Sequence, residues 1–128
     1  MVVDSSALAA VLFGESGALD VAGRLADGGV IIGAPTRLEI GIVIEARGGS
    51  DGVRTLESLL RTAAIEVVSF TSDHGAIALE AFRRYGKGRH RASLNYGDCM
   101  SYAVAKSLNV ALLYVGDDFP HTDILSAL

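Results

Sequence analysis

Carboxylates stand beside or inside apolar runs at four points of this 128-residue chain. Asp4 ends MVVD, Glu39 lies within TRLEIGIVIEA, Asp98 begins the run DCMSYAVAK, and the pair Asp117/Asp118 follows VALLYV after one glycine. A buried carboxylate is costly unless a cation neutralises it. Hard divalent ions such as Mg²⁺ prefer oxygen ligands. We therefore predict that these acids share a site for Mg²⁺, with Mn²⁺ as a substitute, of the kind that serves phosphate chemistry.

Each acid also has an ordinary structural explanation. Asp4 suits a helix N-cap, and Asp98 suits a first helical turn, where the helix dipole favours negative charge. The pair Asp117/Asp118 suits a turn after a strand. Glu39 shares its helix with Glu45, so a solvated stripe would explain both, although the apolar residues around Glu39 predict that little of this helix faces water. One shared site accounts for all four positions together, and we favour it for that reason.

The elements that must position these acids follow from the alternation of short apolar runs with longer helical patterns. We expect strands at 1–4, 30–35, 65–70 and 111–115, and helices at 7–13, within 14–29, and at 36–47, 51–64, 71–86 and 97–107. Such alternation predicts an α/β domain with a mainly parallel sheet. Ligands of such sheets bind beyond the carboxyl ends of the strands, which places Asp4 and Asp117/Asp118 at one edge.

Local signals set two of the expected boundaries. Ser5 or Ser6 suits the N-cap of the first helix. Gly48 and Gly49 suit the end of the helix at 36–47, with GGSDG as a loop before the next helix.

Length and composition bound the class of protein. With 50% hydrophobic residues, 128 residues make one domain, 1–128, with a real core. No apolar run reaches the roughly 18 residues of a membrane span, and no basic lead precedes the first apolar run, so we expect a cytoplasmic protein without a membrane partner. Cys99 is the single cysteine, which excludes an internal disulfide and a cysteine-based zinc site and suits a small buried helix residue.

Basic residues gather in one segment of a chain whose net charge is −4. The segment RRYGKGRHR holds Arg83, Arg84, Lys87, Arg89 and Arg91. Because this segment precedes Asp98 closely, we predict that it binds RNA phosphates, although a solvated loop is the ordinary explanation of such a run.

Aromatic residues flank the basic segment. Tyr85 and Tyr96 are candidates for stacking on bases, although packing is the commoner role of a single tyrosine. The histidines His74, His90 and His121 lack ligand spacing, and we expect structural or surface roles for them.

Three motifs resemble one family. VVDSSALAAVL resembles the opening motif of PIN-domain nucleases, and LNYGDCMSYAVAK resembles a motif of the VapC toxins of bacterial toxin–antitoxin pairs. LLYVGDDFPHTDI resembles the closing motif of the same family. The motifs cover both ends and the middle of the chain, so the resemblance is effectively full length.

The resemblance implies a PIN-like three-layer α/β/α domain with a mainly parallel central sheet. It further implies an endoribonuclease, a hydrolase of phosphodiester bonds in cellular tRNA or rRNA, that depends on Mg²⁺ or Mn²⁺. The implied partners are the RNA substrate, a cognate VapB antitoxin that inhibits the enzyme, and a second copy in a homodimer.

Residue by residue, the resemblance assigns the catalytic acids Asp4, Glu39, Asp98 and Asp117/Asp118. Among these it implies that Asp4, Asp98 and Asp118 hold the metal, with Ser6 as the small hydroxyl residue nearby. Many PIN domains carry an acid where this chain has Gly116, so Asp117 is an alternative to Asp118 as the fourth acid. Asp123 matches a recurrent acid of the tail, for which we expect a structural role.

Other functions remain open from the residues alone. A non-catalytic PIN-fold module that binds RNA or an antitoxin predicts RNA retention without cleavage. A receiver-like phosphoacceptor domain also gathers acids around Mg²⁺, but it needs a lysine after a late strand, and no lysine follows Lys106. Cleavage of DNA rather than RNA is a third alternative.

Overall fold

Four short strands form the central sheet of the computed structural model, which describes residues 1–128. They are β1 (Val2–Val3), β2 (Ile31–Gly33), β3 (Glu66–Val68) and β4 (Leu112–Leu113). The sheet has the order β3-β2-β1-β4, and every pair is parallel. The predicted parallel sheet is therefore confirmed, although each strand is shorter than its apolar run.

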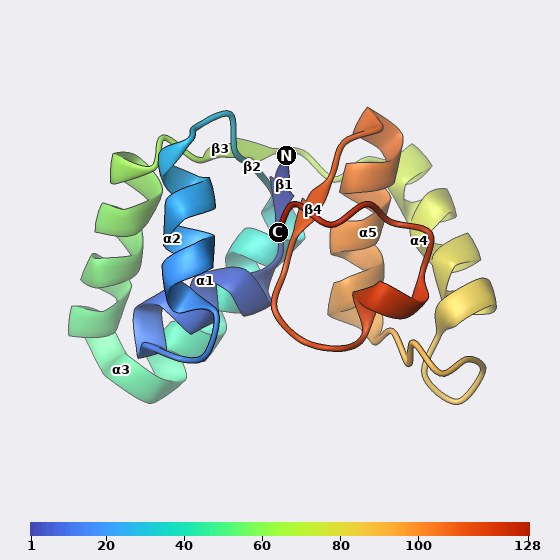
Figure 1. Ribbon diagram of the computed structural model, residues 1–128, viewed down its shortest axis with the longest axis horizontal. Coiled ribbons are helices and arrows are strands. Elements are labelled where there is room, and N and C mark those ends of the chain that lie inside the picture. Colours follow the sequence, from blue (N-terminus) through green and yellow to red (C-terminus); the bar gives the residue numbers. More distant parts are fainter.

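Helices cover both faces of this sheet (Figure 1). They are α1 (Ser5–Phe13), α2 (Ala18–Ala26), α3 (Ala34–Thr62), α4 (Ser72–Tyr85), α5 (Tyr96–Leu108) and the short 3₁₀ helix η1 (Phe119–His121). Helices α1, α2 and α3 lie on one side, and α4 and α5 lie on the other. This arrangement is the three-layer α/β/α architecture that the resemblance implies.

The alternation of side chains along the strands divides the core in two. Val3 and Leu113 point into a cluster with Leu8 of α1 and Ile40 of α3. Their strand neighbours, Val2 and Leu112 among them, point into a second cluster with α4 and α5. Successive residues of a strand face opposite sides, so each short strand serves both layers.

The start of α1 differs from the prediction of a serine cap. Asp4, in extended backbone, is the N-cap, and its carboxylate accepts a hydrogen bond from the amide of Ser6. Ser5 and Ser6 are the first helical residues instead. An aspartate caps a helix as well as a serine does, so the strand's last residue takes the position.

The predicted helix boundary at Gly48 and Gly49 is confirmed, but it is a break at Gly49 alone and not a loop over GGSDG. α3 runs through this segment, with one interruption at Gly49 (φ 58°, ψ −154°), a conformation that is essentially restricted to glycine. The helix also begins earlier than predicted, at Ala34, because Pro35 is favourable in a first turn. The label α3 thus covers two helices that meet at Gly49, without the intervening loop that the sequence predicts.

The tail covers the open edge of β4. The amide of Leu112 donates to the carbonyl of Leu125 (2.8 Å), and that of Ala127 donates to the carbonyl of Leu112 (2.9 Å). Pairing of this kind protects an edge strand. No single helix is long and apolar enough to cross a membrane, whereas α1 and α2 reach that length and hydropathy together with a bend of 113° between them.

Candidate active site

Asp4 is the buried centre of the site. Its residue is 2% exposed, and it lies where β1 ends and α1 begins. The hydroxyl of Ser6 donates to Oδ2 (2.6 Å), and so does the amide of Ser6 (3.0 Å). Ser6 Oγ in turn accepts a hydrogen bond from the amide of Val115, beyond β4 (3.2 Å). Ser6 therefore joins the ends of two neighbouring strands around the carboxylate, beside which the resemblance places it.

The second oxygen of Asp4 is held from the other side of the sheet. Ser101 of α5 donates its hydroxyl to Oδ1 (2.5 Å), and the hydroxyls of Ser101 and Thr36 lie 3.1 Å apart. Both residues are buried. The sequence did not lead us to predict this pair. The spacing of Ser101, three residues after Asp98 and on the same face of the helix, is the pattern that could have indicated it.

Glu39 projects from α3 toward the start of α5. Its Oε2 is buried without a hydrogen-bond partner, and a Cβ added to Gly97 would lie 2.7 Å from both carboxylate oxygens. Burial and the negative charge of Asp4 raise the pKa of Glu39. Glu45 is exposed and separate. Glu39 thus belongs with Asp4 rather than with a solvated stripe.

The prediction that little of the helix around Glu39 faces solvent is wrong. Leu38 is 63% exposed and Ile42 is 60% exposed. The carboxylate is therefore buried by contact with α5 and not by a fully buried helix.

Asp98 has two roles. As the third residue of α5 it completes a capping box, since its Oδ2 accepts from the amide of Asn95 (2.9 Å) and the Asn95 side chain accepts from its own amide (2.9 Å). Burial, together with the charges of Asp4, Asp118 and Glu39, raises the pKa of Asp98 to about 6. The predicted position of Asp98 in the first turn of a helix is confirmed, and the same carboxylate is acted on by the charges of the other acids.

Asp118 is the exposed residue that precedes η1, beyond the carboxyl end of β4. Its negative charge is among those that raise the pKa of Asp98, and that of Asp117 is not. The electrostatics favour Asp118 over Asp117 as the fourth acid. We call Asp4, Glu39, Asp98 and Asp118 the acid cluster.

The acid cluster has the chemistry of a divalent-cation site but is not closed around one point. No three His, Cys, Asp or Glu side chains of the chain are grouped tightly enough to hold an ion as they stand. A hard cation would provide a partner for Oε2 of Glu39 and would offset the burial and negative charge that raise the pKa of Glu39 and of Asp98. The residues fit Mg²⁺ or Mn²⁺, with side-chain adjustment on binding.

The predicted RNA-binding segment divides into two parts. Arg83 pairs with Glu80 (3.4 Å), and Arg84 lies 3.8 Å from Asp123 and donates to the hydroxyl of Tyr85. The remaining residues, Lys87, Arg89 and Arg91, are exposed and make no ion pair. These three are available to a polyanion without breaking an ion pair, although the guanidinium of Arg89 lies over the ring of Phe82, 5.5 Å from its centroid.

The two tyrosines predicted as candidates for stacking on bases differ in their exposure. Tyr85 is 8% exposed and packs against His90 and Tyr102, so it is a core residue rather than a stacking surface. Tyr96, at the start of α5, is 81% exposed.

The remaining site candidates have structural roles. Cys99 is buried, and burial raises the pKa of its thiol to about 11, as expected of an unreactive helix residue. His74 links the two helices of its layer, because Nδ1 accepts from the amide of Thr71 and Nε2 lies 2.9 Å from Ser107 Oγ.

Comparison with known proteins gives concordant matches. The family model for the PIN domain matches residues 1–125. Ribonuclease VapC30 of Mycobacterium tuberculosis is 46% identical over 125 residues, which are 97% of this chain and 95% of that protein.

Two solved structures share the fold. The crystal structure of Mycobacterium tuberculosis VapC20, described as a sarcin–ricin loop cleaving toxin, has a TM-score of 0.78 at 18% identity and covers 98% of this chain and 97% of its own. A toxin–antitoxin complex from Klebsiella pneumoniae has a TM-score of 0.69 at 15% identity, covering 95% of this chain and 92% of that one.

Proposed function

Because this chain belongs to the PIN-domain family and, within it, to the VapC ribonucleases, we propose that it is a toxin that hydrolyses phosphodiester bonds of cellular tRNA or rRNA with Mg²⁺ or Mn²⁺. The observation that carries the proposal is the acid cluster, in which a buried aspartate lies at the carboxyl end of β1 among three further carboxylates. Membership of the PIN-domain family excludes the alternative of a receiver-like phosphoacceptor domain. A cytoplasmic location belongs to the same proposal, since the proposed substrates are found there.

Asp4, Asp98 and Asp118 are the residues that would hold the ion. When bound, a divalent ion supplies Lewis-acid activation of the scissile phosphate and lowers the pKa of water at the site. The hydroxyls of Ser6 and Ser101 fix the orientation of the Asp4 carboxylate from opposite sides. Asp4 is therefore oriented before any ligand arrives, which lowers the cost of ordering it.

Glu39 is suited to binding the water molecule that attacks the phosphate. Its Oε2 has an unused lone pair in a buried position, and its raised pKa brings it closer to neutrality as a proton acceptor. We assign Glu39 the role of positioning the attacking water and accepting its proton. Lys87, Arg89 and Arg91 would bind flanking phosphates and so orient the RNA strand toward the acid cluster.

An antitoxin of the VapB type is the proposed inhibitor. The negative charges of the cluster add to the burial that raises the pKa of Asp98 and Glu39, so an arginine or lysine from a partner would be stabilised there as a divalent ion would. Such a cation would displace the metal while the rest of the partner covers the surface nearby. Toxin copurified with its antitoxin should bind Mn²⁺ much more weakly than toxin alone.

The homodimer has a candidate surface. Exposed apolar side chains of three helices surround two adjoining pockets that share Phe70, Tyr96 and Met100. We define the apolar face as the exposed Leu38, Ile42, Leu79, Phe82 and Tyr96, together with the half-buried Phe70 and the buried Met100, which line both pockets. A contiguous apolar surface of this kind is typical of an interaction site, and we propose a second copy of the chain as its occupant.

Cleavage of total RNA tests the function. Purified protein, free of antitoxin, is incubated with a tRNA and rRNA mixture in Mg²⁺ or Mn²⁺, beside EDTA and the Asp98→Asn variant. Discrete fragments that require metal and are absent with the variant are expected. The same RNA retained on a filter but left intact by folded, metal-supplied protein would instead support a non-catalytic binding module, and cleavage of single-stranded DNA alone would reassign the substrate.

A further inference from the structure

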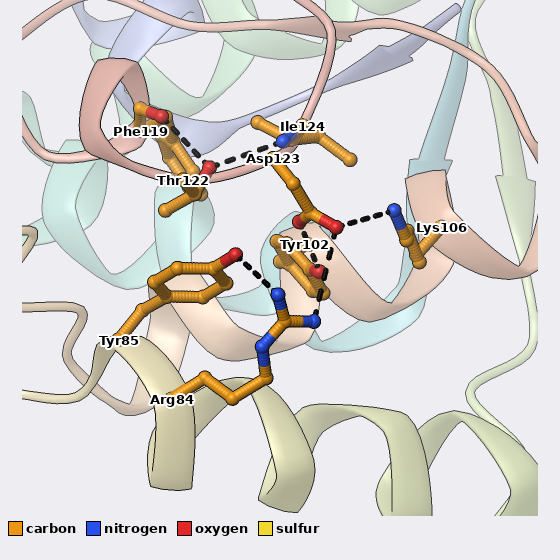
Figure 2. A network of polar contacts seen from close by, with 8 residues as sticks. All are labelled: Arg84, Tyr85, Tyr102, Lys106, Phe119, Thr122, Asp123 and Ile124. Atoms are coloured by element: carbon orange, nitrogen blue, oxygen red, sulfur yellow. Dashed lines mark hydrogen bonds and ion pairs between the residues drawn. The ribbon is translucent and has the colours of Figure 1, made fainter.

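Asp123, in the tail, accepts hydrogen bonds from two residues of α5, one of them a lysine, and faces a second cation from α4 (Figure 2). The hydroxyl of Tyr102 donates to Oδ1 (2.6 Å), and the ammonium of Lys106 donates to Oδ2 (2.8 Å). The guanidinium of Arg84 lies 3.8 Å from Oδ2. No step of the proposed reaction uses this carboxylate.

The partners of Asp123 are themselves fixed. Tyr102 is 3% exposed, and Arg84 is oriented by its hydrogen bond to the hydroxyl of Tyr85 (2.8 Å) and by its position over that ring. Burial alone would raise the pKa of Asp123, but the hydrogen bonds from Lys106 and Tyr102 hold that pKa below its usual value. The carboxylate is thus charged and bound to a rigid surface of the α4–α5 layer.

What Asp123 anchors is the segment between Gly116 and Asp123, which we call the closing loop. Phe119 of this loop is buried against Tyr114, with ring centroids 5.0 Å apart. The side chain of Thr122 donates to the carbonyl of Phe119 (2.7 Å) and accepts from the amide of Ile124 (3.2 Å). Figure 2 shows that these turn contacts lie directly beside the Asp123 carboxylate. The loop is therefore one stiff turn held at Phe119 and at Asp123.

Asp118 is the residue before Phe119 in the same turn. We propose that Asp123 is a positioning residue, which by binding Tyr102 and Lys106 fixes the closing loop and with it the position of Asp118 beyond the carboxyl end of β4. The proposal rests on the proposed function for its consequence in metal binding. An anchor of this kind resembles the outer partners that orient metal ligands elsewhere.

Two variants distinguish a role of Asp123 in positioning the closing loop from a general role in holding the tail. Asp123→Ala removes the anchor. Arg24→Met is the matched control, since Arg24 of α2 donates to the carbonyl of Ala127 (2.7 Å) and so holds the tail outside the closing loop. Both variants should remain folded, because the tail keeps its pairing with Leu112.

Amide hydrogen exchange provides a readout that needs neither metal nor RNA. The amide of Thr122, bonded to the carbonyl of Phe119 (2.9 Å), should exchange at least about tenfold faster in Asp123→Ala and at the wild-type rate in Arg24→Met. Unchanged exchange in Asp123→Ala would overturn the proposal. This result stands whether or not the protein proves to be a nuclease.

A double-mutant cycle with Asp118 tests the consequence for the site. Calorimetric Mn²⁺ affinity should fall about tenfold in Asp123→Ala and should fall no further when Asp123→Ala is added to Asp118→Asn. Independent, additive losses would mean that Asp123 acts by another route and would contradict the proposal. If wild-type protein binds no Mn²⁺, the proposed function fails, and the exchange rates alone decide whether Asp123 fixes the loop.

Discussion

At the scale of single residues, the acid cluster stores an unfavourable interaction in the metal-free protein. Burial first, and then the negative charges of Asp4, Asp118 and Glu39, raise the pKa of Asp98 from 3.8 to about 6. The folded protein then binds the Asp98 proton more tightly than the unfolded chain does. Between pH about 4 and about 6 the contribution of Asp98 to the free energy of unfolding therefore decreases as pH rises.

Replacing that charge should stabilise the metal-free protein. Asp98→Asn keeps an oxygen that accepts from the Asn95 amide and removes the repulsion, so in EDTA at pH 7 we expect Tm to rise by about 3 °C, a value reduced for partial exposure. Differential scanning calorimetry measures it. At pH 4 the gain should vanish, since wild-type Asp98 is then protonated.

The matched control is Asp117→Asn, because Asp117 does not contribute to the shifted pKa. We expect this variant to keep the wild-type Tm and most of the cleavage activity. A lower Tm for Asp98→Asn in EDTA would show that the repulsion is not present in the folded protein.

At the scale of elements, Gly97 decides how closely α5 approaches α3. Gly97→Ala places a methyl group 2.7 Å from both oxygens of Glu39, the flexible end of that side chain. The carboxylate should move away, with at least a tenfold loss of kcat and little loss of stability, because alanine is the better helix former by about 1 kcal/mol. Initial cleavage rates and thermal melts together measure this.

Gly75 is the control for a glycine-to-alanine change within a helix. A Cβ at Gly75 in α4 meets nothing within 4 Å. Gly75→Ala should gain stability and keep activity. Equal activity in Gly97→Ala and wild type would remove Glu39 from the reaction.

The kink of α3 permits another comparison between neighbouring glycines. Gly49 has φ 58° and ψ −154°, whereas Gly48 does not have a positive φ, and neither would have a crowded Cβ. Gly49→Ala should therefore lower the free energy of unfolding by about 1–3 kcal/mol. Gly48→Ala should be neutral or slightly stabilising. Urea denaturation of both variants decides between a required kink and a helix that tolerates any residue there.

At the scale of the whole molecule, the apolar face should determine the assembly. Ile42→Glu places a charge within it, and sedimentation equilibrium at micromolar concentrations should change from a dimer mass to a monomer mass. Leu19→Glu is the control, because Leu19 is 88% exposed on α2 in the opposite layer. A monomer mass for the wild type would contradict the proposed homodimer.

Much of this architecture was predictable because local signals agree with the global fold. The ends of two predicted strands located Asp4 and the pair Asp117/Asp118. The alternation of strands with helices predicted the parallel sheet. The apolar helical run around Glu39 located that acid, and the three motifs around Asp4, Asp98 and Asp117/Asp118 indicated the family.

What sequence reasoning missed depends on contacts between distant segments. The hydroxyl pair of Thr36 and Ser101 and the anchor of Asp123 join residues far apart in the chain. The break predicted at Gly48 and Gly49 is present, but one glycine in a special conformation makes it, so no loop separates the two helices of α3. Burial of Tyr85 likewise follows from packing against Tyr102, which no local pattern indicates.

Calorimetric titration of Mn²⁺ into wild-type protein and into Asp98→Asn at pH 7.5 tests the central claim, that the acid cluster is one divalent-cation site. We predict saturable binding to the wild type and an affinity at least tenfold lower in the variant, whose fold is unchanged by circular dichroism. Identical isotherms for the two proteins would contradict the claim and place any metal elsewhere in the chain.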